Sequence, residues 1–253
     1  MNIRHRLLPA VFTAATCLGS LHAQDPAHPE QPPGEEKSLK THALEMGANL
    51  LQSDGPLHHI DAHLCGFHFY SGDIKRQVMS IHFCAGMNEE MRQCVIYDSD
   101  KADARLIGVE YIISERLFKT LAEEEKKLWH SHRYEVKSGV LFAPNVPNIA
   151  EKELMKQLVN TYGKTWHFWQ VDRGDTLPLG VPQLMMGFTQ DGQIHPDLLK
   201  KGEEYFKVSS EKLKANRADI SASEIAPGAD AWMKGAALQL KLETVPALSL
   251  IHI

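Results

Sequence analysis

The chain has 253 residues, of which 43% are hydrophobic and 23% are charged. This length allows one substantial domain with tails or two small domains, and this composition excludes a fibrous or a wholly disordered protein. The formal net charge of −5 and the isoelectric point near 6.3 argue against a dedicated nucleic-acid binder, because such proteins carry a basic surplus. We therefore expect a globular protein with no nucleic-acid partner.

The first 23 residues have the pattern of a secretory signal peptide. Arg4 and Arg6 supply positive charge, an apolar stretch runs from Leu7 to Leu21, and Ala23 closes a cleavage-site pattern. This pattern predicts export, to the periplasm or out of the cell. No other run approaches about 20 apolar residues, so we expect no transmembrane anchor in the mature chain.

The rest of the chain predicts a linker, a domain and an extension. Residues 24–40 are rich in Pro, Glu and Gln, which indicates a disordered linker before a domain over residues 41–209. Residues 210–253 have weak patterning and are interpreted as a C-terminal extension. Helical spacing predicts helices over 38–51, 114–121, 123–129, 148–162 and 195–209, where the second and third form one helix or a pair.

Alternating or β-branched runs predict the strands of the domain. Helices and strands interleave without a regular βαβ rhythm, which favours an α+β fold with a mainly antiparallel sheet and several packed helices. Gly163 is expected to cap the fourth helix. The expected strands cover residues 60–70, 78–84, 93–97, 105–113, 136–142, 166–171 and 183–189.

The first two predicted strands are joined by a hairpin signal. If the turn centres on residues 73–74, His63 opposes Cys84 and Cys65 opposes His82, which gathers four nitrogen or sulfur groups on one face. A slip of one residue would remove this arrangement, because neighbouring side chains of a strand point to opposite faces.

Cysteine usage allows one disulfide in the mature chain. Of the four cysteines, Cys17 falls in the signal-like segment, which leaves Cys65, Cys84 and Cys94. An odd number permits one intramolecular bridge and one free thiol. One hypothesis is a secreted structural protein with a Cys65–Cys84 bridge, and Cys94 is interpreted as a buried, inert thiol.

The segment from Trp129 to Glu135 contains the sharpest signal for chemistry. His130 and His132 are one residue apart and Glu135 follows, and such groups bind divalent transition metals such as zinc, iron, copper or nickel. On a strand the two imidazoles point the same way and bind jointly, whereas on a helix they lie about 200° apart. The alternative is that these polar residues fix a turn. His58, His59 and His63 are the candidates to complete the metal site.

A second set of residues predicts either a ligand or polar site or structural contacts. Acidic residues beside an arginine can serve acid–base work or calcium binding, and they also form turns and ion pairs. The aromatic residues can stack on a ligand or fill the core. No nucleophile elbow occurs, so we assign no catalytic residue. The candidates are Trp129, Tyr134, Trp166, His167, Asp172, Arg173 and Asp175.

Several long strings of this sequence resemble the oil body-associated protein family, over roughly residues 43–199. The resemblance implies a domain of largely unknown function, and plant members are associated with the lipid droplets of seeds. A cytosolic droplet coat needs no export signal, so the first 23 residues depart from the plant pattern. The resembling strings are Arg92–Lys101, Ala104–Ser114, Leu128–His132, Tyr134–Gly139, Tyr162–Asp175 and Leu177–Gly180.

Two hypotheses for function follow. The first is an exported, non-enzymatic protein of the oil body-associated type that binds a lipid surface, a small ligand or a protein partner. The second is a metal-binding module or metal-dependent enzyme that uses a cluster of His130, His132 and Glu135. Metal content distinguishes the two.

Overall fold

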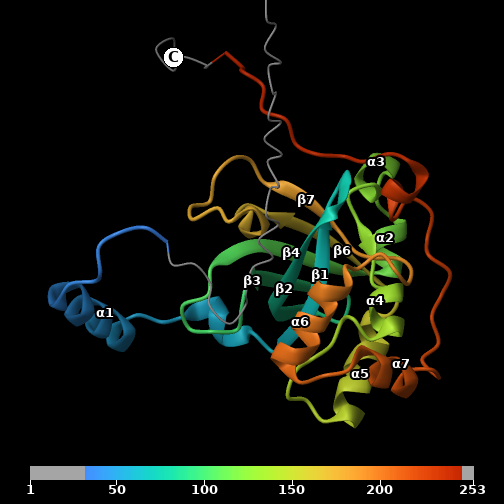
Figure 1. Ribbon diagram of the computed structural model, residues 1–253, viewed down its shortest axis with the longest axis horizontal. Helices are drawn as coiled ribbons and strands as arrows, with labels where there is room; N and C mark the ends of the chain where they lie inside the picture. The colour runs from blue at the N-terminus through green and yellow to red at the C-terminus, as the bar shows by residue number, and fades with distance from the viewer. Residues whose placement is uncertain (1–31, 247–253) are drawn as a thin grey trace, which may run out of the picture.

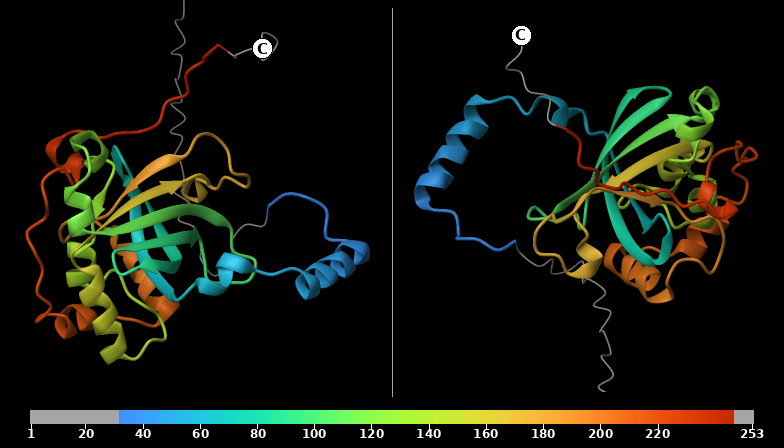
Figure 2. Two further views of the ribbon diagram at one scale, coloured as in Figure 1. Left: turned by 180° about the vertical axis from the view of Figure 1, so that it is seen from behind. Right: turned by 90° about the horizontal axis from the view of Figure 1, so that it is seen from above.

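The strands form one antiparallel sheet that closes on itself. In the computed structural model, which describes residues 32–246, the sheet order is β4-β3-β2-β1-β7-β6-β5, and β4 also pairs with β6. This pairing joins six strands into a barrel, seen from three sides in Figures 1 and 2. The strands are β1 (Ala62–Tyr70), β2 (Asp73–Asn88), β3 (Met91–Tyr97), β4 (Leu106–Ser114), β5 (His130–Ser131), β6 (Thr161–His167) and β7 (Gln183–Met186).

The predicted α+β class and the antiparallel sheet are confirmed, and the closure of the sheet was not predicted. Helices pack around the barrel, except that α1 stands apart from it and buries none of its residues (Figures 1 and 2). The helices are α1 (Leu39–Leu51), α2 (Glu115–Lys119), α3 (Glu123–Lys126), α4 (Arg133–Ser138), α5 (Asn148–Leu158), α6 (Pro196–Phe206) and α7 (Ser210–Asn216), with 3₁₀ turns at Gly55–His59, Val171–Arg173 and Ala231–Lys234. The signal-like segment 1–23 lies outside the described residues.

Three of the predicted elements after residue 130 are wrong in type or bounds. The strand predicted over 166–171 overlaps β6 only at Trp166 and His167, and Val171 begins a 3₁₀ turn. Residues 136–142 form no strand, because α4 runs to Ser138 and Gly139 caps it with a φ of 83°. The helix predicted over 148–162 ends at Leu158, and the predicted cap Gly163 lies inside β6. Tyr162 joins the strand because its ring stacks on Phe118 and its hydroxyl accepts a hydrogen bond from the Ala226 amide.

The predicted register of the β1–β2 hairpin is wrong by one residue. The turn is Ser71–Gly72, with Gly72 at a φ of 91°, and a bulge before it pairs Leu64 with His82. His82 therefore shares the inner face of the barrel with Leu64. His63 and Cys65, which the prediction placed beside it, lie on the other face.

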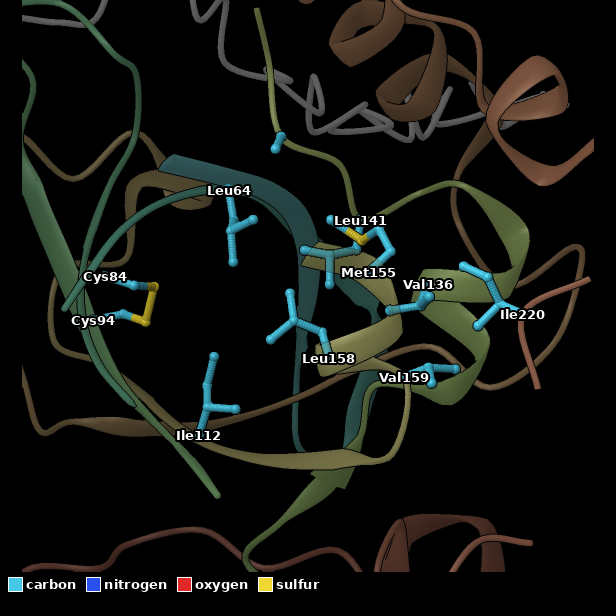
Figure 3. Close-up of a cluster of buried hydrophobic side chains, with 11 residues drawn as sticks. Leu64, Cys84, Cys94, Ile112, Val136, Leu141, Met155, Leu158, Val159 and Ile220 are labelled. Carbon is cyan, nitrogen blue, oxygen red and sulfur yellow. A yellow bond between two sulfur atoms is a disulfide. The ribbon is translucent and has the colours of Figure 1, made fainter. Parts of the chain in front are cut away.

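One end of the barrel is filled by apolar side chains and a disulfide. Cys84 and Cys94 are direct partners in the β2–β3 ladder and form the bridge, while Cys65 is buried and free, so the hypothesised Cys65–Cys84 bridge is wrong. Met155 and Leu158 of α5 pack in the same buried cluster as these cysteines (Figure 3). The hairpin, α4 and α5 thus share one core.

A buried arginine ties the segment after α7 to this core. Arg217 is fully buried, donates to the carbonyls of Val136 at 2.6 Å and Leu141 at 2.9 Å, and forms an ion pair with Glu151. Since these groups lie on α4, α5 and the loop between them, Arg217 holds three segments together.

We expect Arg217→Met to destabilise the protein strongly. Removing one partner of a buried ion pair leaves the Glu151 carboxylate and two carbonyls unpaired, which costs about 3–5 kcal/mol. Urea unfolding measures the loss. Lys152→Met is the matched control, because it breaks an exposed ion pair with Asp219 between the same two segments and should cost less than about 1 kcal/mol. Equal losses in the two variants would contradict this role of Arg217.

Candidate functional site

A polar layer crosses the interior of the barrel between two apolar layers. On β1, β2 and β4 the inward-facing residues change from apolar to polar and back to apolar along the strand. Because both ends of the interior are apolar, the polar groups in the middle are shielded from water. The sequences of layers are Leu64, His68 and Tyr70 on β1; Cys84, His82 and Val78 on β2; and Ile112, Glu110 and Ile107 on β4.

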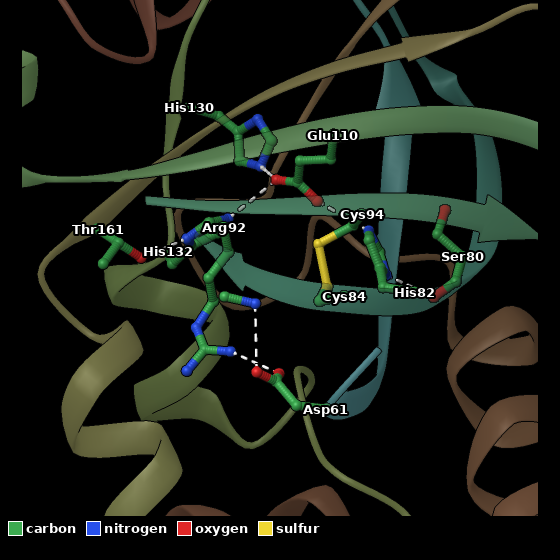
Figure 4. The surroundings of a disulfide bond; sticks show 11 residues. Asp61, Ser80, His82, Cys84, Arg92, Cys94, Glu110, His130, His132 and Thr161 are labelled. Atoms are coloured by element: carbon green, nitrogen blue, oxygen red, sulfur yellow. Dashed lines mark hydrogen bonds and ion pairs between the residues drawn. A yellow bond between two sulfur atoms is a disulfide. The ribbon is translucent and has the colours of Figure 1, made fainter. Parts of the chain in front are cut away.

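Glu110 is the centre of the polar layer and is only 2% exposed. Its Oε2 lies 2.9 Å from His82 Nε2. Its Oε1 lies 3.2 Å from His132 Nε2 and 3.5 Å from His130 Nε2 (Figure 4). Burial acts to raise the pKa of Glu110, but the contacts with His132 and His82 outweigh it and hold that pKa well below its usual value. This low pKa holds while His132 and His82 donate hydrogen bonds and positive charge to the carboxylate.

The far ring nitrogens of two of these histidines are held in place. His132 Nδ1 lies 2.8 Å from Thr161 Oγ1, whose hydroxyl donates to the Leu158 carbonyl at 2.7 Å. A hydroxyl has one proton, so Thr161 accepts from His132 and the proton is on Nδ1. His82 Nδ1 lies 3.1 Å from the Ser80 carbonyl, which can only accept. A neutral imidazole then points the lone pair of Nε2 at Glu110 in both cases.

Three further histidine rings lie in or beside this layer. His68 Nδ1 is 3.4 Å from His167 Nε2, and the ring of His68 is 5.5 Å from that of His130. Both ring nitrogens of His130 and Nδ1 of His167 are buried without a hydrogen-bond partner. Burial lowers the pKa of His130 and of His167 to about 3 and that of His68 well below its usual value. These rings are neutral at physiological pH and offer unprotonated nitrogens.

Two more carboxyl groups are buried close by. Burial, together with the negative charges of Glu110 and Asp230, raises the pKa of Glu135 well above its usual value. Burial raises the pKa of Asp230 to about 6, although Asp230 accepts from the Ser131 amide at 3.0 Å and the Ser131 hydroxyl at 2.7 Å. The C-terminal segment thus contributes an acid next to the two predicted ligands.

Glycines leave the room that the polar layer occupies. A Cβ added at Gly163 would lie 1.9 Å from Glu110 Oε1 and 2.8 Å from His132 Nε2. A Cβ at Gly187 would lie 2.7 Å from His130. The remaining cavity is about 10 Å³, which is about the space that one water molecule needs, and it is lined by His68, His82, Glu110, His132 and Glu135 among others.

The chain matches one protein family and several plant relatives. The model of the family described as "Protein of unknown function (DUF1264)" matches residues 54–221. Oil body-associated protein 1A of Zea mays is 50% identical over 217 residues, which cover 85% of this chain and 91% of that protein. Oil body-associated protein 1B of Arabidopsis thaliana is 48% identical over 211 residues, 83% of this chain and 88% of that one. The chain belongs to the oil body-associated protein family.

The predicted resemblance is therefore confirmed over most of the chain. No solved structure matches this member of the oil body-associated family. The predicted export is wrong, because the relatives are named as oil body-associated proteins of plants and not as secreted or periplasmic proteins. Within residues 32–246, no helix has the length and apolar character needed to span a membrane.

Of the six residues predicted to bind a metal, two reach the centre of the polar layer. His130 lies in β5 and His132 just before α4, so the two histidines are not on a helix. Both rings face Glu110, as predicted for an extended backbone. Two groups of buried side chains could hold a metal ion: His68, His82 and Glu110, and Glu110, His130 and His132. Glu135 is buried nearby but belongs to neither group. His58, His59 and His63 also belong to neither group. His58 and His59 are exposed, and the ring of His63 stacks on Phe83.

Most of the predicted ligand or polar residues make hydrogen bonds, an ion pair or packing contacts within the fold. His167 alone joins the polar layer. Trp166 packs against an outer apolar cluster. Trp129 donates to Glu125 at 3.0 Å, Tyr134 donates to Asp191 at 2.9 Å, Asp172 accepts from Tyr70 at 2.6 Å, and Arg173 pairs with Asp175.

Sequence reasoning did not single out His68 and Glu110, and it placed His82 with His63 and Cys65 rather than with Glu110. Glu110 carries a usable signal, because an acid in the β-branched run from Leu106 to Ile113 has no ordinary role in a buried strand. His68 and His82 occupy inward positions of their strands, and only the correct register reveals this.

We expect Gly163→Ala to disrupt the polar layer. The new methyl group overlaps the Glu110 carboxylate and the His132 ring, so the interior must rearrange at a cost of about 1–3 kcal/mol. Urea unfolding measures the change. Gly47→Ala in the exposed helix α1 is the control, because nothing lies within 4 Å of its new Cβ. A Gly163→Ala protein as stable as the control would contradict the close contacts described.

Proposed function

We propose that this member of the oil body-associated family binds a divalent transition metal inside its barrel, with Glu110, His130 and His132 as ligands. The single observation that carries the proposal is the orientation of His132. Its Nδ1 proton is fixed by Thr161, so a neutral His132 ring turns its Nε2 lone pair toward the nearer Glu110 oxygen, 3.2 Å away. A lone pair and a carboxylate repel each other, and a cation between them turns the repulsion into two attractive bonds.

The three groups suit such an ion. One atom from each of Glu110, His130 and His132 can be chosen so that all lie within 4.8 Å of one another, and all three residues are buried. Ligand atoms around one ion at about 2.1 Å lie roughly 3.3–4.2 Å apart, so small side-chain shifts close the site. Two imidazoles and one carboxylate are typical ligands of zinc and of non-haem iron. The support of His132 by Thr161 is the kind of outer contact that metal-bound histidines usually have.

A proton is the alternative to the metal. If His132 or His82 were protonated on both nitrogens, each would donate to Glu110 and the layer would be a buried ion-pair network. That network explains the contacts of His132 and His82, but it leaves both nitrogens of His130 without a partner. A buried imidazole with two unpaired nitrogens is costly, whereas a metal ion would use one of them.

We expect purified protein, dialysed against zinc and then against buffer, to retain at least one ion per chain by elemental analysis. Glu110→Gln and His130→Gln/His132→Gln should lower the retained metal at least tenfold, because each removes ligands while keeping side-chain volume. His58→Gln/His59→Gln is the matched control, since these two adjacent histidines are exposed and lie outside both ligand groups. Circular dichroism verifies that each variant is folded. Folded wild-type protein without zinc would refute the proposal and favour the proton network.

A second candidate function is attachment to a lipid surface through α1. This helix buries none of its residues, and Leu39, Leu50 and Leu51 are each more than four-fifths exposed at 89%, 84% and 85%. Exposed apolar side chains on an unpacked helix are typical of segments that lie in a membrane interface. The relatives are named for their association with oil bodies.

Flotation with phospholipid-coated triacylglycerol emulsions tests this attachment. Leu50→Ser/Leu51→Ser should reduce the floating fraction, because burial of each leucine contributes about 1.5–3 kcal/mol to binding. Leu242→Ser/Val245→Ser is the control, since these residues are 81% and 71% exposed at the other end of the described chain. Equal flotation of all three proteins would exclude α1 as the attachment site.

A further inference from the structure

We infer that the barrel holds a second cation, bound by His68 and His82 on the other oxygen of Glu110, so that Glu110 bridges a two-metal centre. The inference rests on the proposed metal site at His130 and His132 and adds a distinct set of ligands to it. Its support comes from the arrangement of the rings around the two carboxylate oxygens.

The second set repeats the features of the first. His82 Nε2 lies 2.9 Å from Glu110 Oε2, and its Nδ1 proton is held by the Ser80 carbonyl, so a neutral His82 ring also turns its Nε2 lone pair toward the carboxylate. The contact is not aligned as a hydrogen bond, and Nε2 is buried without a partner. The ring of His68 lies 5.1 Å from that of His82. His68, His82 and Glu110 also offer one ligand atom each within a mutual distance of 4.8 Å.

The candidate ligands fall into two separate groups of atoms. The two triads share only Glu110, and no group that combines His68 or His82 with His130 or His132 meets the same distance limit among the described residues. Each oxygen of Glu110 faces its own histidines: Oε2 faces His82, and Oε1 faces His130 and His132 (Figure 4). A carboxylate that binds one ion through each oxygen holds the two ions about 3.5–4 Å apart, the spacing of known two-metal sites.

Neighbouring residues orient the second set of ligands and supply carboxyl groups that can offset the charge of a second ion. His167 Nε2, on β6, lies 3.4 Å from His68 Nδ1 and orients that ring. Two divalent cations need more than one negative charge nearby. Glu135 lines the same cavity as Glu110, and Asp230 bonds to Ser131, between the two histidines of the first set. Glu135 therefore lies in the same cavity as Glu110, and Asp230 is buried behind β5.

Titration of the metal-free full chain with Co²⁺ tests the inference through the number of ions bound. We expect wild-type protein to bind two Co²⁺ per chain by calorimetry and visible absorption. We also expect the second equivalent to weaken the electron paramagnetic resonance signal of the first, because the shared carboxylate couples the two ions. His68→Gln/His82→Gln should bind one Co²⁺ with no such weakening. His59→Gln is the control and should bind two.

The outcomes separate the two proposals. Two ions per chain in wild-type protein and one in the His68→Gln/His82→Gln variant support the bridged centre. A single ion per chain in wild-type protein overturns the second site and leaves the first intact. No bound ion overturns both. If the double variant does not fold, the wild-type stoichiometry and its resonance signal still decide the question.

Discussion

The interior of this protein is organised around the buried carboxylate of Glu110. A charge removed from water must be compensated within the fold, and the compensating groups come from β2, β5 and the residue before α4. These elements are far apart in the sequence and meet only because β4 pairs with both β3 and β6. The closure of the barrel and the placement of the histidines therefore depend on the same strand.

The polar layer is shielded from water because apolar groups close both ends of the barrel. On one side, the Cys84–Cys94 bridge and α5 exclude water; on the other, Tyr70, Ile96 and Val171 do so. In such an environment an unpaired imidazole nitrogen costs free energy, so a purely structural role does not account for the two unpaired nitrogens of His130. A cation explains them together with the tautomers of His82 and His132.

The two proposed functions use different parts of the chain and do not compete. The proposed metal ligands lie inside the barrel, whereas the exposed leucines of α1 lie outside it on a helix that buries none of its residues. The names of the plant relatives concern oil bodies, and the name of the family model states no activity. A metal centre in the interior would give this family a chemical role in addition to its association with lipid.

The sequence by itself determined the family, the α+β class and most of the strands, because these depend on local patterns: long family-specific strings, alternating or β-branched runs, and helical spacing. It also singled out His130 and His132, which are neighbours in the chain. Only the tertiary structure decided which residues meet them. Glu110, His68 and His82 lie on other strands, and a one-residue shift in the β1–β2 register, set by the Ser71–Gly72 turn and a bulge, would turn His82 to the outside. Contacts across a closed barrel depend on the register between strands and on the closure of the sheet. Neither can be predicted from the sequence pattern of a single strand.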